Sequence, residues 1–301
     1  MRPTPSLACL ASLILFGAIG PLPAAEPSAG AAPTAPIADS PPSTALPSAP
    51  AEWKVDYSRW ADGQHYGTAE ARADWPTLVW YEEPGDTCIR EFPAGSGRKW
   101  LEPRFKAGTH TKGAHGCKFA AELAPSDTYT VEYAVHFPAD WEFSQGNTHP
   151  YGGGKLPGLS GGSHPSGGLG KPDGMSARPM WRRDNRFSKE IQNYLELYLY
   201  WPTQSEKYGD RFFVQPVAAG HTYTIKLQVV LGTPETDGTV RIWIDGTLRL
   251  EKPFRFLQPG QDWKLTQYMH NVFYGGNDPT WAPAHDQHLL LGPVHVSAKP
   301  F

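Results

Sequence analysis

Apolar and polar side chains alternate along several stretches of this 301-residue chain. Over residues 129–137 the odd positions are apolar and the even positions are mostly polar, and residues 222–231 repeat the pattern. A period of two indicates a β-strand with one buried face. Residues 240–244 and 247–251 flank an Asp-Gly pair, which predicts a tight β-hairpin. A last strand is predicted at residues 288–297.

No long stretch carries the spacing of an amphipathic helix, while 31 Gly and 31 Pro provide turns. Successive strands separated by turn residues predict an all-β domain. We expect an antiparallel two-sheet sandwich of the jelly-roll type. A large sandwich commonly has one concave face, so we also expect a concave groove that can hold a chain-like substrate.

The first residues indicate an export signal. Arg2 supplies a positive charge, residues 7–19 an apolar run and residues 24–25 a cleavage site. The apolar run is too short to span a membrane. We therefore expect a signal peptide at residues 1–25 and a secreted or periplasmic protein.

A linker is predicted next, because residues 26–50 are almost all Ala, Pro, Ser, Thr and Gly. Such a stretch cannot bury enough apolar surface to offset the entropy lost on ordering. The folded domain is then expected at residues 51–301, with a monomer as the default state.

Charge and cysteine content narrow the possible partners. The formal net charge is −3, so no global basic field is present to attract nucleic acid, and an acidic substrate would need a local cluster of cations. Beyond the predicted signal peptide the chain has two cysteines, Cys88 and Cys117. In an oxidising compartment we expect one disulfide between them, with two buried free thiols as the alternative.

Candidate catalytic residues lie in two neighbouring segments. Residues 151–162 are rich in glycine, which lets other groups approach the backbone closely, and Lys155 stands at the centre of this predicted loop. The alternative for Lys155 is a solvated side chain in a surface turn. Ser176 and Arg178 are two positions apart and therefore share one face of a strand.

A third segment, residues 194–201, has two contrasting faces. Leucines at positions 195, 197 and 199 suit a core, whereas the opposite face carries Tyr194, Glu196, Tyr198 and Tyr200. A row of phenols with one carboxylate is a poor solvent surface but suits the floor of a groove. A second buried layer is the alternative.

These residue types suit the β-elimination of uronic acids. The enzyme must remove a proton next to a carboxylate, and Lys155 or Arg178 could neutralise that carboxylate. A general base then takes the proton, and a general acid protonates the departing glycosidic oxygen. Tyrosine can do both, provided that nearby cations lower its pKa from about 10.

The three segments together resemble polysaccharide lyase family 14, the alginate and glucuronate lyases. The similarity rests on Gly-Gly-Lys-Leu-Pro-Gly-Leu at residues 153–159, Ser-Ala-Arg-x-Met-Trp-Arg at 176–182 and x-Tyr-x-Tyr at 197–200. It covers most of residues 85–290. The resemblance implies a β-jelly roll with the active site on its concave face.

The resemblance also implies the catalytic residues. Lys155 corresponds to the family's essential loop lysine, Ser176 and Arg178 to its Ser-x-Arg pair, and Tyr198 and Tyr200 to its Tyr-x-Tyr pair, in which a tyrosine is proposed as acid or base.

One departure from the family concerns residues 182–196, which form a longer stretch here. This stretch makes Tyr194 an alternative to the other tyrosines. It also contains Arg183, Arg186 and Lys189, which form either a basic lip on the groove or a solvated loop.

We further predict four substrate-binding residues, namely His149, Arg182, Tyr194 and Glu196. The Asp and His residues at positions 278, 285, 286 and 288 lack the spacing of a metal site. We therefore expect neither a metal ion nor a cofactor.

The predicted function is that of a secreted polysaccharide lyase that cleaves a uronic-acid polymer, with alginate as first choice and glucuronan as second, to give unsaturated ends. One alternative is a non-catalytic module that binds an acidic glycan. Retention of all five predicted catalytic residues argues against it. The other alternative is a glycoside hydrolase, which needs two carboxylates across the groove. Glu196 and Glu132 are the only candidates for that pair.

Overall fold

The computed structural model describes residues 49–82, 86–110, 116–168, 172–276 and 278–300. The predicted signal peptide lies outside the described residues, as does the predicted linker except for its last two residues. All described residues belong to one compact unit within residues 45–301. Among them, no helix is both long enough and apolar enough to cross a membrane.

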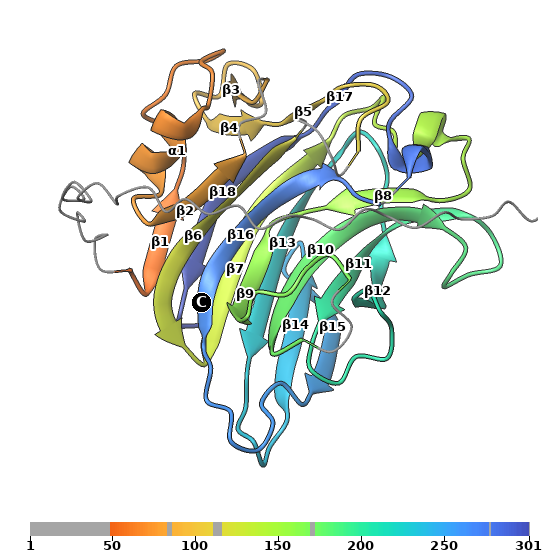
Figure 1. The fold of residues 1–301 in the computed structure, drawn as a ribbon. Helices are drawn as coiled ribbons and strands as arrows, with labels where there is room; N and C mark the ends of the chain where they lie inside the picture. Colours follow the sequence, from red (N-terminus) through yellow and green to blue (C-terminus); the bar gives the residue numbers. More distant parts are fainter. Residues whose placement is uncertain (1–48, 83–85, 111–115, 169–171, 277, 301) are drawn as a thin grey trace, which may run out of the picture. The chain divides into compact units, whose positions relative to one another are not determined.

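Two large antiparallel sheets face each other (Figure 1). The first, here called the back sheet, has the spatial order β15 (Thr247–Phe254), β14 (Gly238–Ile244), β13 (His221–Val230), β7 (Thr128–Phe137), β18 (Leu290–Ser297), β4 (Lys99–Glu102) and β3 (Cys88–Glu91), with β1 (Glu52–Val55) paired to β18.

The second, the groove sheet, has the order β12 (Asp210–Pro216), β11 (Gln192–Tyr200), β10 (Gly174–Asp184), β8 (Gly152–Lys155), β16 (Leu265–Tyr274), β6 (Cys117–Ser126) and β2 (Leu78–Glu82), with β9 (Gly158–Gly162) paired to β10 and β16. A small third sheet joins β5 (Arg104–Phe105) and β17 (Gln287–His288). The all-β sandwich predicted from the sequence is confirmed.

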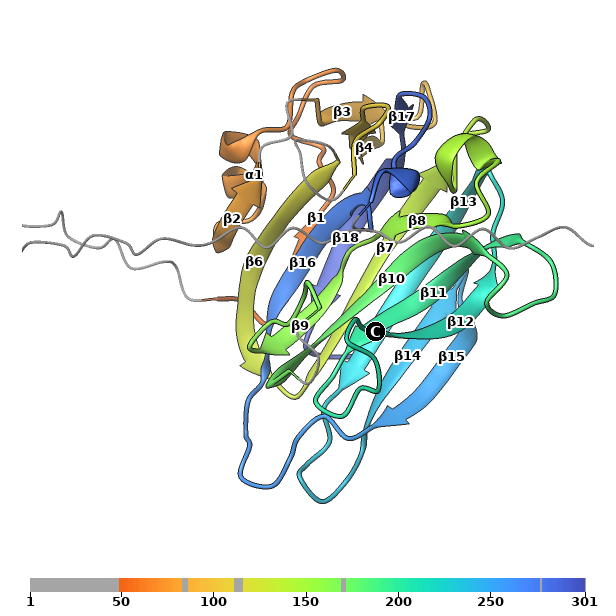
Figure 2. The same cartoon turned by 45° about the vertical axis from the view of Figure 1, so that its right-hand side comes forward.

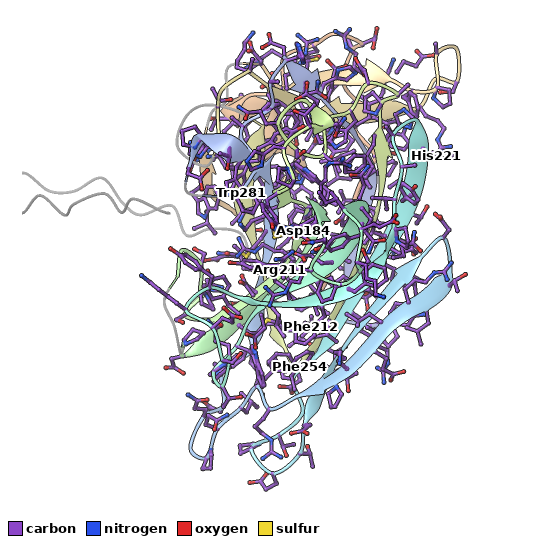
Figure 3. All side chains as sticks on the ribbon, turned by 90° about the vertical axis from the view of Figure 1, so that its right-hand side faces the viewer. Asp184, Arg211, Phe212, His221, Phe254 and Trp281 are labelled. Carbon is purple, nitrogen blue, oxygen red and sulfur yellow. The ribbon has the colours of Figure 1, made fainter. Side chains whose placement is uncertain are left out.

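The core lies between the two sheets and follows the predicted alternation. The odd positions of β7, from Tyr129 to Phe137, are at most 1% exposed. The three leucines of β11 are buried in the same core. At one edge Phe212 of β12 meets Phe254 of β15 with ring centroids 5.3 Å apart, as Figure 3 shows. This contact connects the two sheets.

The predicted hairpin is confirmed, because Asp245 and Gly246 join β14 to β15 with φ angles of 52° and 76°. Two successive positive φ angles match the twist of a tight hairpin. The helices were not predicted from the sequence. They are α1 (Thr68–Asp74) and the 3-10 turns η1 (Gln145–Asn147) and η2 (Pro279–Trp281). All three are too short to show a helical period.

The predicted glycine-rich loop around Lys155 is instead two strands, β8 and β9, which follow one another between β10 and β16 (Figure 2). The glycines permit close packing within the sheet. A Cβ at Gly154 would lie 2.0 Å from the Trp181 ring, and one at Gly158 would lie 2.1 Å from the Ala177 carbonyl oxygen. Lys155 is therefore fixed in a sheet, with Met180 and Phe273 as its strand partners.

The predicted disulfide is not formed, and Cys88 and Cys117 are both buried free thiols. Cys88 begins β3 of the back sheet, whereas Cys117 begins β6 of the groove sheet. The Cys88 thiol faces a carboxylate oxygen of Glu102 at 3.6 Å. The Cys117 thiol is hydrogen-bonded to Tyr81 and Thr87 instead. Each thiol therefore has its own polar partner.

Candidate active site

A groove of about 840 Å³ lies on the face of the groove sheet that points away from the core. Its floor comes from alternate residues of β2, β6, β8, β10, β11 and β16. Of the nine predicted catalytic and substrate-binding residues, the following line the groove: Lys155, Arg178, Arg182, Glu196, Tyr198 and Tyr200. The pairing of distant strands therefore gathers most of the predicted site in one place.

The predicted catalytic residues meet through the registers of three strands. Arg178 of β10 lies opposite Tyr198 of β11, and Ser176 lies opposite Tyr200. The Lys155 ammonium lies 4.8 Å from the centre of the Tyr198 ring. The Arg178 guanidinium lies 5.8 Å from the centre of the Tyr198 ring and 5.9 Å from that of Tyr200. The two cations thus contact the faces of the tyrosine pair.

The two tyrosines form a hydrogen-bonded pair whose phenol oxygens are 3.3 Å apart. Each oxygen also accepts a backbone N–H, from Gly168 to Tyr200 at 2.9 Å and from Gly209 to Tyr198 at 3.2 Å. The pair has two hydroxyl protons, of which the bond between the rings uses one. One hydroxyl proton therefore remains that can be donated into the groove.

Ser176 and Arg178 are both buried, at 0% and 2% exposure. The Ser176 hydroxyl donates to the Pro165 carbonyl at 2.7 Å, and an Arg178 Nη lies 3.5 Å from the Ser176 oxygen. Ser176 does not line the groove. Its contacts hold the segment after β9 and the arginine.

A closed ion-pair network lies beside this site (Figure 3). Arg211 of β12 donates to Glu196 at 2.8 Å and to Asp184 at 2.8 Å, and Arg182 donates to Asp184 at 2.9 Å. The Tyr194 hydroxyl donates to Asp184 at 2.5 Å and does not line the groove.

On the groove side, the Arg182 guanidinium lies 4.4 Å from the centre of the Trp281 ring, and Figure 3 shows Trp281 above Asp184 and Arg211. Arg182 is therefore fixed both by its ion pairs and by an aromatic ring.

Burial shifts the pKa values of the acid–base groups in the site, downward for the lysine and upward for the tyrosine and the glutamate. Burial, with repulsion from Arg178 and Arg182, lowers the pKa of Lys155 well below its ordinary value. Burial and the neighbouring Tyr200 raise the pKa of Tyr198, against the opposing effect of Arg178. Burial also raises the pKa of Glu196 although two arginines oppose the shift.

Asp184 shows the reverse balance. Burial alone would raise the pKa of Asp184, but hydrogen bonds from Tyr194 and Arg211 outweigh it and hold the pKa well below its ordinary value.

The remaining predicted residues lie at the rim or outside the groove. His149 is partly exposed, its ring nitrogen is 2.7 Å from the Tyr151 carbonyl, and it does not line the groove. Of the three cations in the β10–β11 hairpin, Arg186 lines the groove and lies 3.5 Å from Glu206. Arg183 donates to Asn193, and Lys189 is exposed.

The described residues contain no cluster of three or more His, Cys, Asp or Glu side chains that could hold a metal ion. Asp278 accepts a hydrogen bond from the Thr280 backbone within η2. His285 contacts Glu142, and Asp286 accepts from the Ala107 backbone. The acidic and His residues near the end of the chain thus have separate contacts.

Several residues of the groove and of the ion-pair network beside it were not predicted from the sequence. Asp184 and Arg211 were missed because an ion pair between strands leaves no local pattern. Lys118, Asn271 and Trp281 also line the groove. Lys118 of β6 and Asn271 of β16 each stand between two buried residues of their strand. This pattern could have indicated them as residues of one strand face, but nothing in the sequence showed that this face was the groove.

The sequence profile of polysaccharide lyase 14 matches residues 94–292, which is more than half of the chain. No curated protein sequence matches this chain.

Three solved alginate lyases share the fold. Aly36B, with a lysine and a tyrosine replaced by alanine and an alginate tetrasaccharide bound, is 20% identical with a TM-score of 0.69, covering 83% of this chain and 98% of that chain. The marine PL-14 alginate lyase from Aplysia kurodai is 19% identical with a TM-score of 0.60, covering 81% and 97%. The alginate lyase vAL-1 from Chlorella virus is 17% identical with a TM-score of 0.55, covering 70% and 88%.

At these identities the solved structures establish the fold, whereas the profile match establishes the family. The profile match extends from residue 94, before β4, to residue 292 in β18, and so includes every strand of the groove floor except β2. The chain therefore belongs to polysaccharide lyase family 14 and is a polysaccharide lyase.

Proposed function

We propose that this lyase cleaves alginate, with glucuronan as the second candidate, by β-elimination at Lys155, Arg178, Tyr198 and Tyr200. One observation carries the proposal. Among the described residues, Lys155 and Arg178 are the groove cations without a carboxylate partner. A buried arginine and a half-buried lysine, neither of them with an ion-pair partner, favour a ligand that brings its own carboxylate.

The other groove cations are already neutralised. Lys118 pairs with Glu82, Arg186 with Glu206, and both Arg182 and Arg211 with the buried carboxylates of Asp184 and Glu196. The attraction for a uronate carboxylate is therefore focused next to the two tyrosines.

In the proposed reaction, Arg178 and Lys155 neutralise the uronate carboxylate, which makes the proton on the adjacent carbon more acidic. Tyr200 removes that proton as a phenolate. Its oxygen can accept hydrogen bonds from both the Gly168 N–H and the Tyr198 hydroxyl, which stabilise negative charge there. The electron pair forms the new carbon–carbon double bond and expels the glycosidic oxygen.

Tyr198 then protonates the departing oxygen. Its raised pKa keeps the phenol protonated at neutral pH, as a general acid requires. A rival assignment gives the first step to Lys155, because its lowered pKa favours a neutral amine in the empty groove. The entering carboxylate would raise the pKa of Lys155 again, which supports its role as a neutralising cation.

The first experiment mixes the purified protein separately with polymannuronate, polyguluronate and glucuronan and follows ultraviolet absorbance. Elimination creates a conjugated double bond that hydrolysis cannot create. A rise with polymannuronate or polyguluronate supports alginate as the substrate, and a rise with glucuronan alone contradicts that choice. New reducing ends without a rise in absorbance would contradict elimination.

A second experiment separates the two roles of Lys155. Lys155→Arg keeps a positive charge but cannot act as a base at neutral pH. Partial activity in Lys155→Arg, with none in Lys155→Met, supports charge neutralisation. Loss of activity in both variants, with amine rescue of Lys155→Ala, would move the base from Tyr200 to Lys155.

The hydrolase alternative has little support in the groove. Glu132 lies on β7 of the back sheet and pairs with Lys226 at 3.2 Å. The carboxylates that do line the groove, Glu82, Glu196 and Glu206, each have a cationic partner.

We also propose that the protein is exported and monomeric. The sequence of residues 1–25 supports export, which cell fractionation would test. Light scattering of the purified protein would test the oligomeric state.

A further inference from the structure

One edge of the groove, formed by β2, β6 and β16, has polar and apolar residues in two adjacent rows. Strand register puts Glu82 opposite Lys118 and Lys118 opposite Asn271. The row two residues away contains Trp80, Ala120 and Met269. Apart from Ala120, all of these residues line the groove. None belongs to the catalytic group.

The amide of Asn271 has an open hydrogen-bonding position. Asn271 is only 6% exposed, and no described residue donates a hydrogen bond to its Oδ1. A buried acceptor without a donor destabilises the empty groove, because it has lost its hydrogen bonds to water. Such a group in a groove can accept a hydrogen bond from a ligand that carries a donor. A sugar hydroxyl is a donor of the required kind.

Lys118 supplies a cation next to this amide. Its side chain is buried, and its ammonium lies 5.4 Å from the centre of the Phe273 ring, while the ammonium of Lys155 lies 5.1 Å from the same ring. The two lysines are thus near neighbours along the groove.

Glu82, the ion-pair partner of Lys118, has a side chain that is 61% exposed. Because water can solvate Glu82 when its side chain turns away, a substrate carboxylate can take its place beside the buried Lys118.

The neighbouring row supplies an apolar surface. Trp80 is partly exposed, and both Trp80 and Met269, which lie on either side of Ala120 in this row, line the groove. Ligand sites commonly combine aromatic side chains with a few polar groups that fix orientation. A carbohydrate ring offers an apolar face for Trp80 and hydroxyls and a carboxylate for the adjacent row.

We propose that Trp80, Lys118 and Asn271 form a second uronate subsite, which binds a sugar of the polymer that is not itself cleaved. Lys118 binds the carboxylate, Asn271 accepts a hydroxyl hydrogen bond, and Trp80 contacts the sugar face. The proposal rests on the proposed function, because it takes the ligand to be a uronate chain that continues from the catalytic residues toward β2.

The test compares the wild type with Lys118→Gln on uronate oligomers of increasing length. For long oligomers KM should rise about tenfold, as expected for loss of one charged contact of about 1.4 kcal/mol. The shortest cleaved oligomers do not reach the subsite, so their KM should stay unchanged. The value of kcat at saturation should stay near that of the wild type at every length.

Glu82→Gln separates ligand binding from a structural role. It releases Lys118 from its present partner, so KM for long oligomers should fall several-fold. If the Lys118–Glu82 pair were merely structural, both variants would raise KM and lower stability together, which would overturn the subsite. Lys226→Gln is the matched control, since it breaks a Lys–Glu pair in the back sheet and should leave KM unchanged.

The outcomes for the subsite and for the proposed function are distinguishable. Normal cleavage by the wild type with equal KM in Lys118→Gln at all lengths rejects the subsite alone. If no uronate polymer is cleaved, the proposed function fails, and calorimetric titration with a long uronate oligomer still tests the subsite. Weaker binding by Lys118→Gln supports it, and equal binding rejects it. If Lys118→Gln does not fold, Asn271→Ala takes its place in each measurement, with the same expected direction.

Discussion

Two buried arginines on the same strand, Arg178 and Arg182, have opposite surroundings. Arg182 lies in a closed network in which Asp184 and Glu196 balance Arg182 and Arg211. Arg178, four residues away, has no carboxylate partner among the described residues and contacts two tyrosine rings. Arg182 is neutralised within the fold, whereas Arg178 keeps a charge that, in the proposed function, binds the substrate carboxylate.

The largest expected effect comes from removing the unpaired charge. Arg178→Met should lower kcat about 10³-fold, a typical upper value for loss of one electrostatic group at a reacting centre. The same change should increase the free energy of unfolding, because folding buries this guanidinium without a counter-charge. Absorbance assays and urea denaturation measure the two effects.

Arg249→Met is the control for that prediction, since Arg249 is exposed on the back sheet. It should change neither activity nor stability appreciably. A less stable Arg178→Met protein would mean that the two arginines do not differ as described.

Removing an arginine from the ion-pair network should have a smaller effect, and it should lower the stability of the protein instead of raising it. Arg211→Met leaves Glu196 and Asp184 with one cation between them and should reduce the free energy of unfolding by about 3–5 kcal/mol. Urea denaturation at neutral pH would measure this loss. If Arg211→Met were as stable as the wild type, the ion pairs of the network would not stabilise the fold, and the paired and unpaired arginines would not differ in their effect on stability.

The smallest effect depends on pH and concerns Lys155. Because its pKa is lowered on folding, the unfolded state binds more protons and is favoured as the pH falls. Lys155→Met removes this penalty and should be more stable than the wild type at neutral pH. The difference should shrink as the pH rises toward about 10.4, the pKa of an unfolded lysine. Urea midpoints across this range would show it. A difference that grows with pH would contradict the lowered pKa.

The sequence predicted the strands because their alternation is local. It also brought Lys155, Arg178, Tyr198 and Tyr200 together through short motifs and a family resemblance, and the structure puts all four in one groove. Their catalytic roles stay predictions. His149 was selected for closeness in sequence to Lys155, yet closeness in sequence does not put a side chain on the groove face.

What could not be predicted depends on contacts between distant strands. The network of Asp184 and Arg211 requires β10, β11 and β12 to be in register, which no local pattern specifies. The disulfide prediction was wrong because it considered only the number of cysteines, whereas the structure directs Cys88 to Glu102. The loop prediction was wrong because glycine permits tight strand packing as well as turns.

The glycines of β8 also limit how this enzyme can be redesigned. A side chain at Gly153 or Gly154 would collide with neighbouring strands, and one at Gly152 with Ser144, so a library randomised there would yield mostly unfolded clones. The strand that carries Lys155 therefore tolerates few mutations at the three positions before the lysine. New specificities are better sought at the β2 edge of the groove, where exposed residues such as Glu82 can change without disturbing the sheet.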